Sequence, residues 1–167
     1  MLERIAMKKI QLALIFCGLS CLSAAIADEA GDRAAVVDMV QAFFDAMAER
    51  DADAMRSMLT SDGIFYGYRE GPDGLDIART AHQVFIEGLA ERDRTVIERF
   101  WDPRVLLHGR MAAVWTPYDL YVDGDFSHCG IDNFNFLNTD EGWKITGIVF
   151  SMEPDNCAES PLGPLQD

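Results

Sequence analysis

The sequence predicts an α+β domain in which helices come first and paired strands follow. Over residues 32–50 the apolar side chains recur with the 3.6-residue period of a helix. Over residues 111–153 apolar and polar residues alternate, as they do in strands that are buried on one side. Within that region, Asp123-Gly124 is a dipeptide that favours a two-residue hairpin turn. Together these observations predict an N-terminal helical segment packed against a C-terminal antiparallel meander.

The first two helices follow from apolar periodicity and from capping. Asp51 suits the N-cap of a short second helix that carries Met55, Met58 and Leu59. The first helix is longer, and its apolar stripe is wide enough to cover a core. The stripe consists of Val36, Val37, Met39, Val40, Phe43, Phe44 and Met47.

The middle of the chain predicts a strand, a helix and another strand. Residues 64–68 have strand composition, and the Gly71-Pro72-Asp73-Gly74 cluster ends them as a loop. A third helix is expected over about residues 76–90, with His82 on its apolar stripe. From residue 95 to residue 107 the β-branched and aromatic content returns, which predicts extended structure.

The Asp123-Gly124 turn predicts the register of the strands on either side of it. A two-residue connection pairs Tyr121 with Phe126, and an unbroken ladder then pairs Asp119 with His128 and Trp115 with Asp132. Directly opposed residues point to the same side of a sheet. One face is therefore expected to combine aromatic rings with two carboxylates and an imidazole. Its members are Trp115, Asp119, Tyr121, Phe126, His128, Asp132, Phe134 and Phe136.

A second turn, over residues 139–142, is expected to add Trp143, Ile145 and Val149 to that face. The opposite face is mainly polar, but it has three large apolar residues that would otherwise meet water. Because of them, the sequence predicts a homodimer through that face. A slip of one residue would exchange the two faces, so these predictions depend on the register. The three apolar residues are Ile131, Ile148 and Phe150.

Three stretches of the chain resemble the nuclear transport factor 2-like superfamily, also called SnoaL-like or cystatin-like. The resemblance covers about residues 32–153, and it implies a cone in which a strongly curved, mixed or antiparallel sheet wraps around three N-terminal helices and encloses a central cavity. It implies no particular reaction, because the isomerase and cyclase constellations of the superfamily do not match this chain position for position. The stretches are the first helix with Glu49-Arg50-Asp51-Ala52-Asp53-Ala54, then Gly109-Arg110-Met111-Ala112-Ala113-Val114-Trp115, and Asp140-Glu141-Gly142-Trp143-Lys144-Ile145.

The candidates for catalysis are Asp119, His128 and Asp132. A carboxylate that holds an imidazole in one tautomer makes a general base, so Asp119 opposite His128 would form one. Aromatic surroundings would keep Asp132 protonated, so that it could donate a proton. The alternative is structural, with Asp119 and His128 as a solvated pair at a sheet edge and Asp132 paired with an arginine.

The candidates for contact with a ligand are Tyr66, His82, Trp115 and Phe134. Tyr66 would present its hydroxyl from the first strand, His82 would approach from the third helix, and Trp115 and Phe134 would form walls. Each has a structural alternative. A histidine on an apolar stripe often donates to a backbone carbonyl and packs, and the aromatic residues are equally suited to a core.

The sequence leaves several functions open. We expect a cavity for a small hydrophobic or mixed-polarity molecule, with no cofactor and no metal, because no Cys/His cluster or calcium-loop spacing is present. A cofactor-independent isomerase, lyase or cyclase that transfers protons with Asp and His is a second possibility. A dimeric accessory or assembly domain is a third.

The N-terminus predicts export to the periplasm or the medium. Lys8 and Lys9 precede an apolar run over residues 10–22, and Ala25-Ile26-Ala27 has the small-x-small pattern of a signal peptidase site. We therefore expect a cleaved signal peptide at residues 1–27, a single domain at residues 28–153 and a tail at residues 154–167. The apolar run is too short for a comfortable transmembrane helix, so no membrane insertion is expected after cleavage.

Charge and cysteine content narrow the partners further. The net charge is −14, and it becomes −16 once residues 1–27, with three basic residues and one acidic residue, are removed. Such a surface repels phosphate backbones, so nucleic acid is not an expected partner. Cys129 and Cys157 are the cysteines that remain after cleavage, and export permits a disulfide between them.

Overall fold

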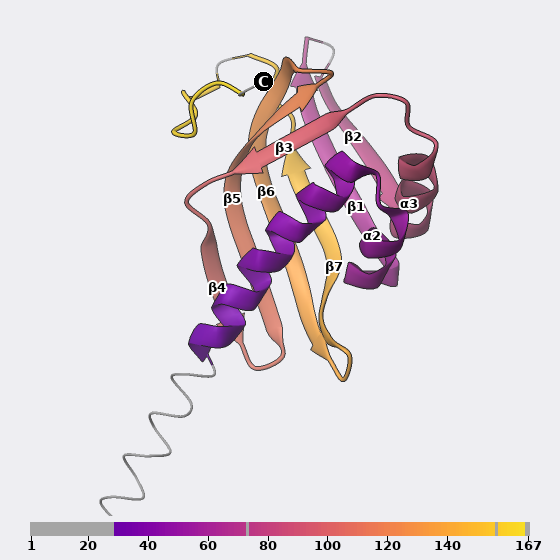
Figure 1. Ribbon diagram of the computed structural model, residues 1–167. Coiled ribbons are helices and arrows are strands. Elements are labelled where there is room, and N and C mark those ends of the chain that lie inside the picture. The colour runs from indigo at the N-terminus through magenta and orange to yellow at the C-terminus, as the bar shows by residue number, and fades with distance from the viewer. Residues whose placement is uncertain (1–28, 73, 156, 166–167) are drawn as a thin grey trace, which may run out of the picture. The chain divides into compact units, whose positions relative to one another are not determined.

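The computed structural model describes residues 29–72, 74–155 and 157–165 (Figure 1). The predicted signal peptide lies outside the described residues. The chain divides into two compact units, residues 1–34 and residues 35–167. In the first unit, residues 29–34 are helical, and Arg33 forms an ion pair with Glu29 at 2.8 Å. The second unit contains the β-sheet and the helices that pack on it.

The second unit begins with the remainder of the first helix, residues 35–49. The elements that come after it are α2 (Ala52–Met58), β1 (Leu59–Gly71), β2 (Gly74–Ala81), α3 (His82–Ala90), β3 (Val96–Phe100), β4 (Arg104–His108), β5 (Met111–Val122), β6 (Asp125–Thr139) and β7 (Gly142–Ser151). The strands form one sheet in the order β2-β1-β7-β6-β5-β3, and β4 pairs with β5. The β1–β7 pair is parallel and the other pairs are antiparallel. This mixed sheet with N-terminal helices confirms the predicted α+β fold class.

The core lies between the helices and one face of the sheet, which we call the inner face. In Figure 1 residues 35–49 of the first helix lie in front of β5, β6 and β7, and α2 and α3 lie beside β1. The ring of Phe43, on the first helix, lies 5.6 to 6.0 Å from four other phenylalanine rings. Aromatic pairs at this spacing add to the free energy of burial, so the cluster anchors the helix to the sheet. The four partners are Phe44, Phe65, Phe85 and Phe134.

Capping at α2 agrees with the sequence, whereas the start of the third helix was predicted wrongly. The Asp51 side chain accepts hydrogen bonds from the backbone N–H groups of Asp53 and Ala54, as an N-cap does. The third helix begins at His82, and residues 74–81 form β2 instead. Gly74, at a φ of 110°, allows the tight turn that pairs β2 with β1, and this long-range pairing overrides the local helical pattern.

The turn between β5 and β6 forms as predicted, with Asp123 at a φ of 54° and Gly124 at a φ of 88°. Tyr121 lies opposite Phe126, but the next pair is Leu120 with His128, so Ser127 is the extra residue of a β-bulge. The unbroken ladder was therefore the wrong prediction. Beyond the bulge, Asp119 lies opposite Cys129, and Trp115 lies opposite Asn133. The side chains of β5 consequently face the reverse of the predicted direction.

A second bulge lies in β7, where Thr146 is the extra residue between the Asn135–Gly147 and Phe136–Ile145 pairs. It places Ile148, which is 4% exposed, on the inner face and Val149, which is 44% exposed, on the outer face. Both are the reverse of the prediction. Two of the three apolar residues that suggested a dimer, Ile148 and Phe150, therefore pack inside the domain.

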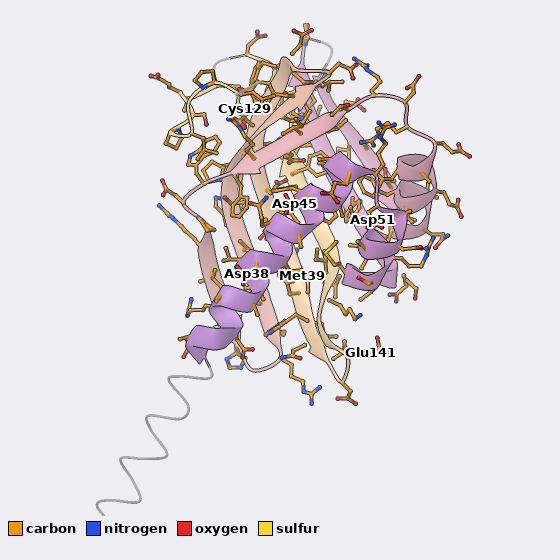
Figure 2. The ribbon with its side chains drawn as sticks, in the orientation of Figure 1. Asp38, Met39, Asp45, Asp51, Cys129 and Glu141 are labelled. Atoms are coloured by element: carbon orange, nitrogen blue, oxygen red, sulfur yellow. A yellow bond between two sulfur atoms is a disulfide. The ribbon has the colours of Figure 1, made fainter. Side chains whose placement is uncertain are left out.

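The C-terminal tail is fastened to the sheet at two points. A disulfide joins Cys129 to Cys157, with their Cα atoms 5.9 Å apart, which confirms the predicted bridge. Figure 2 marks Cys129 at the end of the sheet where the tail lies. Further along, Arg99 Nη2 donates a hydrogen bond of 3.0 Å to the carbonyl oxygen of Gly163. The tail is therefore held by a covalent bond and by a cation on β3.

Candidate functional site

A cavity of about 300 Å³ opens between the inner face of the sheet and the helices. Its walls are largely aromatic, and polar side chains are gathered on β3, β5 and β6. The volume is at the lower end of the range for small-molecule sites. The aromatic walls are Phe43, Phe44, Phe65, Phe85, Phe134 and Phe150, and the polar lining residues are Arg92, Glu98, Tyr118, Ser127, His128 and Asp132.

Glu98 reaches the cavity because of the alternation along β3. Val96 and Phe100, on either side of it, are apolar and pair with inner-face residues of β5, whereas Arg99 pairs with Asp119 on the outer face. A strand turns every second side chain to the same side, so Glu98 must point inward with its apolar neighbours. Asp132 arrives from β6 and is 3% exposed.

Glu98, which is partly exposed, and the buried Asp132 form an acid pair. Burial raises the pKa of Asp132 to about 7, and the hydrogen bond with Glu98 partly opposes this effect. Burial also raises the pKa of Glu98 well above its ordinary value, and the charge of Asp132 and the hydrogen bond with it add to the increase. A hydrogen bond between two carboxyls requires a proton on one of them, so the pair holds a shared proton near neutral pH.

One oxygen of this pair is available to a ligand. Asp132 Oδ2 is buried and has no hydrogen-bond partner among the described residues. A buried carboxyl oxygen without a partner lowers stability, and a ligand that supplies a donor would remove this penalty. The cavity thus presents an acceptor next to a shared proton, inside a mainly aromatic chamber.

Tyr118 lines the cavity but is not an available acid. Its hydroxyl donates a 2.6 Å hydrogen bond to the carbonyl oxygen of Ser151, and its side chain is buried. Burial, together with the charges of Glu98 and Asp132, raises the pKa of Tyr118 further above its ordinary value. The proton on Tyr118 is therefore fixed in a structural bond, and the residue serves as a neutral wall.

His128 is a neutral imidazole in the cavity wall. Burial lowers its pKa, and the positive charge of Arg69 lowers it further. Its Nδ1 lies 3.0 Å from the hydroxyl oxygen of Ser127, the bulge residue. Asp119 does not face it, so the predicted Asp119–His128 base is corrected to a Ser127–His128 contact.

Three of the predicted residues lie away from the cavity, on the outer face. Asp119 is buried there against Arg99, whose Nε donates to Oδ1 at 2.9 Å and whose Nη2 donates to Oδ2 at 2.5 Å. Trp115 is 52% exposed, because the bulge at Ser127 reverses β5. Tyr66 also points outward from β1, and its hydroxyl accepts a 3.3 Å hydrogen bond from Arg79.

His82 is buried beside the core and does not line the cavity. It is 1% exposed, and its Nδ1 lies 2.8 Å from the carbonyl oxygen of Thr60, to which it donates. Its ring packs at 4.4 Å from the ring of Phe65, and Gly63 leaves the space that the imidazole occupies. The geometry matches the structural alternative, a histidine that donates to the backbone and packs. Of the predicted site residues, His128, Asp132 and Phe134 line the cavity.

Sequence reasoning missed Glu98, Tyr118 and Arg92. For Glu98 a signal was present, because it stands between Val96 and Phe100 on one side of a five-residue strand. An unbroken ladder would turn Tyr118 to the outer face, and the bulge turns it inward. Arg92 comes just after α3 and carries no pattern that points toward a cavity.

The described ranges contain no group of three or more His, Cys, Asp or Glu side chains placed to hold a metal ion. Within the same ranges, none of the helices is both long and apolar enough to cross a bilayer.

Comparison with known families and structures gives two results. The model of a family described as "Putative lumazine-binding" matches residues 31–151. Among solved structures, an NTF2-like protein from Cytophaga hutchinsonii is 12% identical with a TM-score of 0.61, and the match covers 72% of this chain and 97% of that one. An NTF2-like superfamily protein from Salmonella enterica serovar Typhimurium is 10% identical with a TM-score of 0.61, covering 80% and 98%.

A third structure, an NTF2-like protein with a cystatin-like fold from Novosphingobium aromaticivorans, is 15% identical with a TM-score of 0.61, and the match covers 77% of this chain and 86% of that one. No curated protein matches this chain. At such identities the structural likeness shows the fold alone, and that fold is the NTF2-like fold that the sequence resembles.

Proposed function

Because this chain belongs to the family described as "Putative lumazine-binding", we propose that its cavity binds a small, flat heteroaromatic molecule. The observation that carries the proposal is the Glu98–Asp132 pair with its buried, unpartnered oxygen, Asp132 Oδ2. Lumazine, a bicyclic pteridine-dione, is the probe that the family description suggests.

The acid pair suits one edge of such a molecule. A lactam edge carries an N–H donor beside a carbonyl acceptor. Asp132 Oδ2 can accept a hydrogen bond from the lactam N–H, and the single proton of the pair can turn from the bond between the two carboxyls toward the lactam carbonyl. The pair carries one negative charge, and hydrogen bonds from the ligand would stabilise that charge inside the cavity.

The walls suit the faces of the ring system. Phe43, Phe85 and Phe134 are among the six phenylalanines that line the cavity, and aromatic faces bind flat rings by stacking and by edge contacts. A cavity of about 300 Å³ suits a bicyclic ring with small substituents better than a long chain.

Titration calorimetry with lumazine tests the proposal. For a ligand of this size we expect a Kd of roughly tens of micromolar. Asp132→Asn should weaken binding by about tenfold or more, because an amide cannot share a proton with Glu98 in the same way. Asp125→Asn, at the exposed start of the same strand, is the matched control and should bind normally. Absence of lumazine binding to the wild-type protein would refute the proposal.

A proton-transfer enzyme is the second candidate, and the same acid pair favours it. A carboxyl with a pKa of about 7 in an apolar cavity can accept and return a proton near neutral pH. If so, the protein should catalyse deuterium exchange of the acidic methyl protons of 6,7-dimethyllumazine, followed by NMR. Asp132→Asn should then slow exchange by roughly 10² when the probe is saturating, so that the loss is separate from the weaker binding. Binding without accelerated exchange of this probe would favour the binding role.

We also propose that the protein is exported and cleaved after Ala27. The Cys129–Cys157 disulfide supports this, because such bonds persist in oxidising compartments. The intact mass of the protein from the envelope fraction tests it, and a mature N-terminus other than Asp28 would contradict it.

We still propose a homodimer, but through other residues than Ile148 and Phe150, which pack inside the domain. Trp115 and Val149 are exposed on the outer face and could meet a second copy of this chain. Sedimentation of the wild-type protein and of Trp115→Lys tests it. A monomer at tens of micromolar, well above roughly micromolar affinities, would contradict it.

A further inference from the structure

The cavity has a positive group that the acid pair does not neutralise. Arg92 is the only arginine or lysine among the described residues that line it. Its guanidinium carbon lies 6.0 Å from the centroid of the Phe85 ring, so the cation is held over an aromatic wall. Within the described residues it makes no ion pair, whereas Arg94, two residues later, pairs with Asp123 at 3.0 Å.

The positive charge of Arg92 does not counter the raised pKa values of the acid pair. If Arg92 were close to the acid pair, it would favour the ionised carboxylates. Instead the pKa values of Glu98 and Asp132 are raised, and the opposing influence on Asp132 is the hydrogen bond with Glu98. The cavity therefore offers a carboxyl pair that shares one proton and carries a single negative charge, together with a cation that forms no ion pair with it.

A second guanidinium acts on the same chamber. The positive charge of Arg69 lowers the pKa of His128, a lining residue. Among the described residues Arg69 likewise has no ion-pair partner. In a chain of net charge −14, long-range electrostatics disfavour anions. An anionic ligand would therefore need such local cations in order to bind.

We propose that the natural ligand carries a carboxylate, which pairs with the guanidinium of Arg92 while its heteroaromatic end meets Glu98 and Asp132. The inference rests on the proposed function and adds the charge class of the ligand. The planar guanidinium can bind a carboxylate with two parallel hydrogen bonds. The partly buried position of Arg92 makes such a pair stronger than one on the open surface.

Two probes that differ by one charge test this inference, namely lumazine and lumazine-6-carboxylate. The wild-type protein should bind the carboxylate at least about tenfold more tightly than the neutral ring. Arg92→Gln should abolish that preference, so that the two probes bind this variant with affinities within about threefold of each other. Arg94→Gln, a nearby arginine that does not line the cavity, is the matched control and should retain the preference. Thermal melting confirms that each variant is folded.

The outcomes separate this inference from the proposed function. If lumazine binds but the carboxylate binds no more tightly, the inference is overturned and the proposed function stands. The same holds if Arg92→Gln retains the preference, or if Arg69→Gln rather than Arg92→Gln abolishes it. If neither probe binds the wild-type protein, the proposed function itself fails.

Discussion

Replacing Asp132 by asparagine should make the protein more stable at high pH and should remove part of its pH dependence. The pKa of Asp132 is raised from 3.8 to about 7, so the folded state holds a proton that the unfolded state releases. Below about pH 4 Asp132 is protonated in both the folded and the unfolded state, so its ionisation does not lower the free energy of unfolding. Between pH 4 and pH 7 the cost rises by 1.36 kcal/mol per pH unit, and above pH 7 it is constant at roughly 4 kcal/mol.

Asparagine has nearly the same shape and cannot ionise, and its amide can donate to the Glu98 carboxylate. We therefore expect Asp132→Asn to exceed the wild type by roughly 2 to 4 kcal/mol in free energy of unfolding at pH 8, and by far less at pH 4.5. The lower value allows for Glu98, which shares the proton and retains part of the ionisation cost in the variant.

Urea denaturation at half-unit steps from pH 4.5 to pH 8.5 measures this difference directly. Asp125→Asn, an exposed carboxylate on the same strand, controls for the change of one unit of net charge. A difference between Asp132→Asn and the wild type that does not vary with pH would refute the reasoning. So would a variant that is less stable than the wild type at every pH.

Three further changes test other parts of the structure by chemical denaturation. The double variant Cys129→Ser/Cys157→Ser should have a free energy of unfolding roughly 3.5 kcal/mol lower than the wild type, because the disulfide closes a loop over a sequence separation of 28 residues. Equal stability of the variant and the wild type would contradict this. Asp119→Asn should lower the free energy of unfolding by about 2 to 3 kcal/mol, because Arg99 becomes a poorly paired charge near the tail. A loss below about 0.5 kcal/mol would show that the Arg99–Asp119 pair is solvated. Gly63→Ala should lower the free energy of unfolding by about 1 to 3 kcal/mol, because the added methyl overlaps the imidazole of His82. An unchanged denaturation midpoint would mean that the ring can move aside.

The parts of the fold that were predictable are those with local signals. The period of residues 36–47, the cap at Asp51 and the Asp123-Gly124 turn each arise from the chemistry of a few adjacent residues, and all three are present. The disulfide was predictable because export would leave Cys129 and Cys157 as the only mature cysteines.

The parts that failed depend on distant contacts. At Ser127 and at Thr146, nothing in the adjacent residues distinguishes a bulge from a regular strand position. The bulges are favoured because they bring Tyr118 and Ile148 inward to fill the core, which is a property of the whole sheet. The register shift at Ser127 also explains why His128 and Asp132, on β6, were placed on the correct face, whereas Asp119 and Trp115, opposite this part of β6 on β5, were not.

The same two bulges should be visible in the tolerance of the chain to mutation, without any structure. In a saturation scan, a regular strand tolerates polar substitutions at every second position in one unbroken phase. In β7 the intolerant positions should be odd-numbered up to Ile145 and even-numbered from Ile148, so the phase should change at Thr146. In β6 the intolerant even-numbered series should begin at His128 and exclude Phe126, which is 47% exposed. A single inserted residue thus leaves a change of parity in a functional screen, and that change can locate a bulge in relatives known only by sequence.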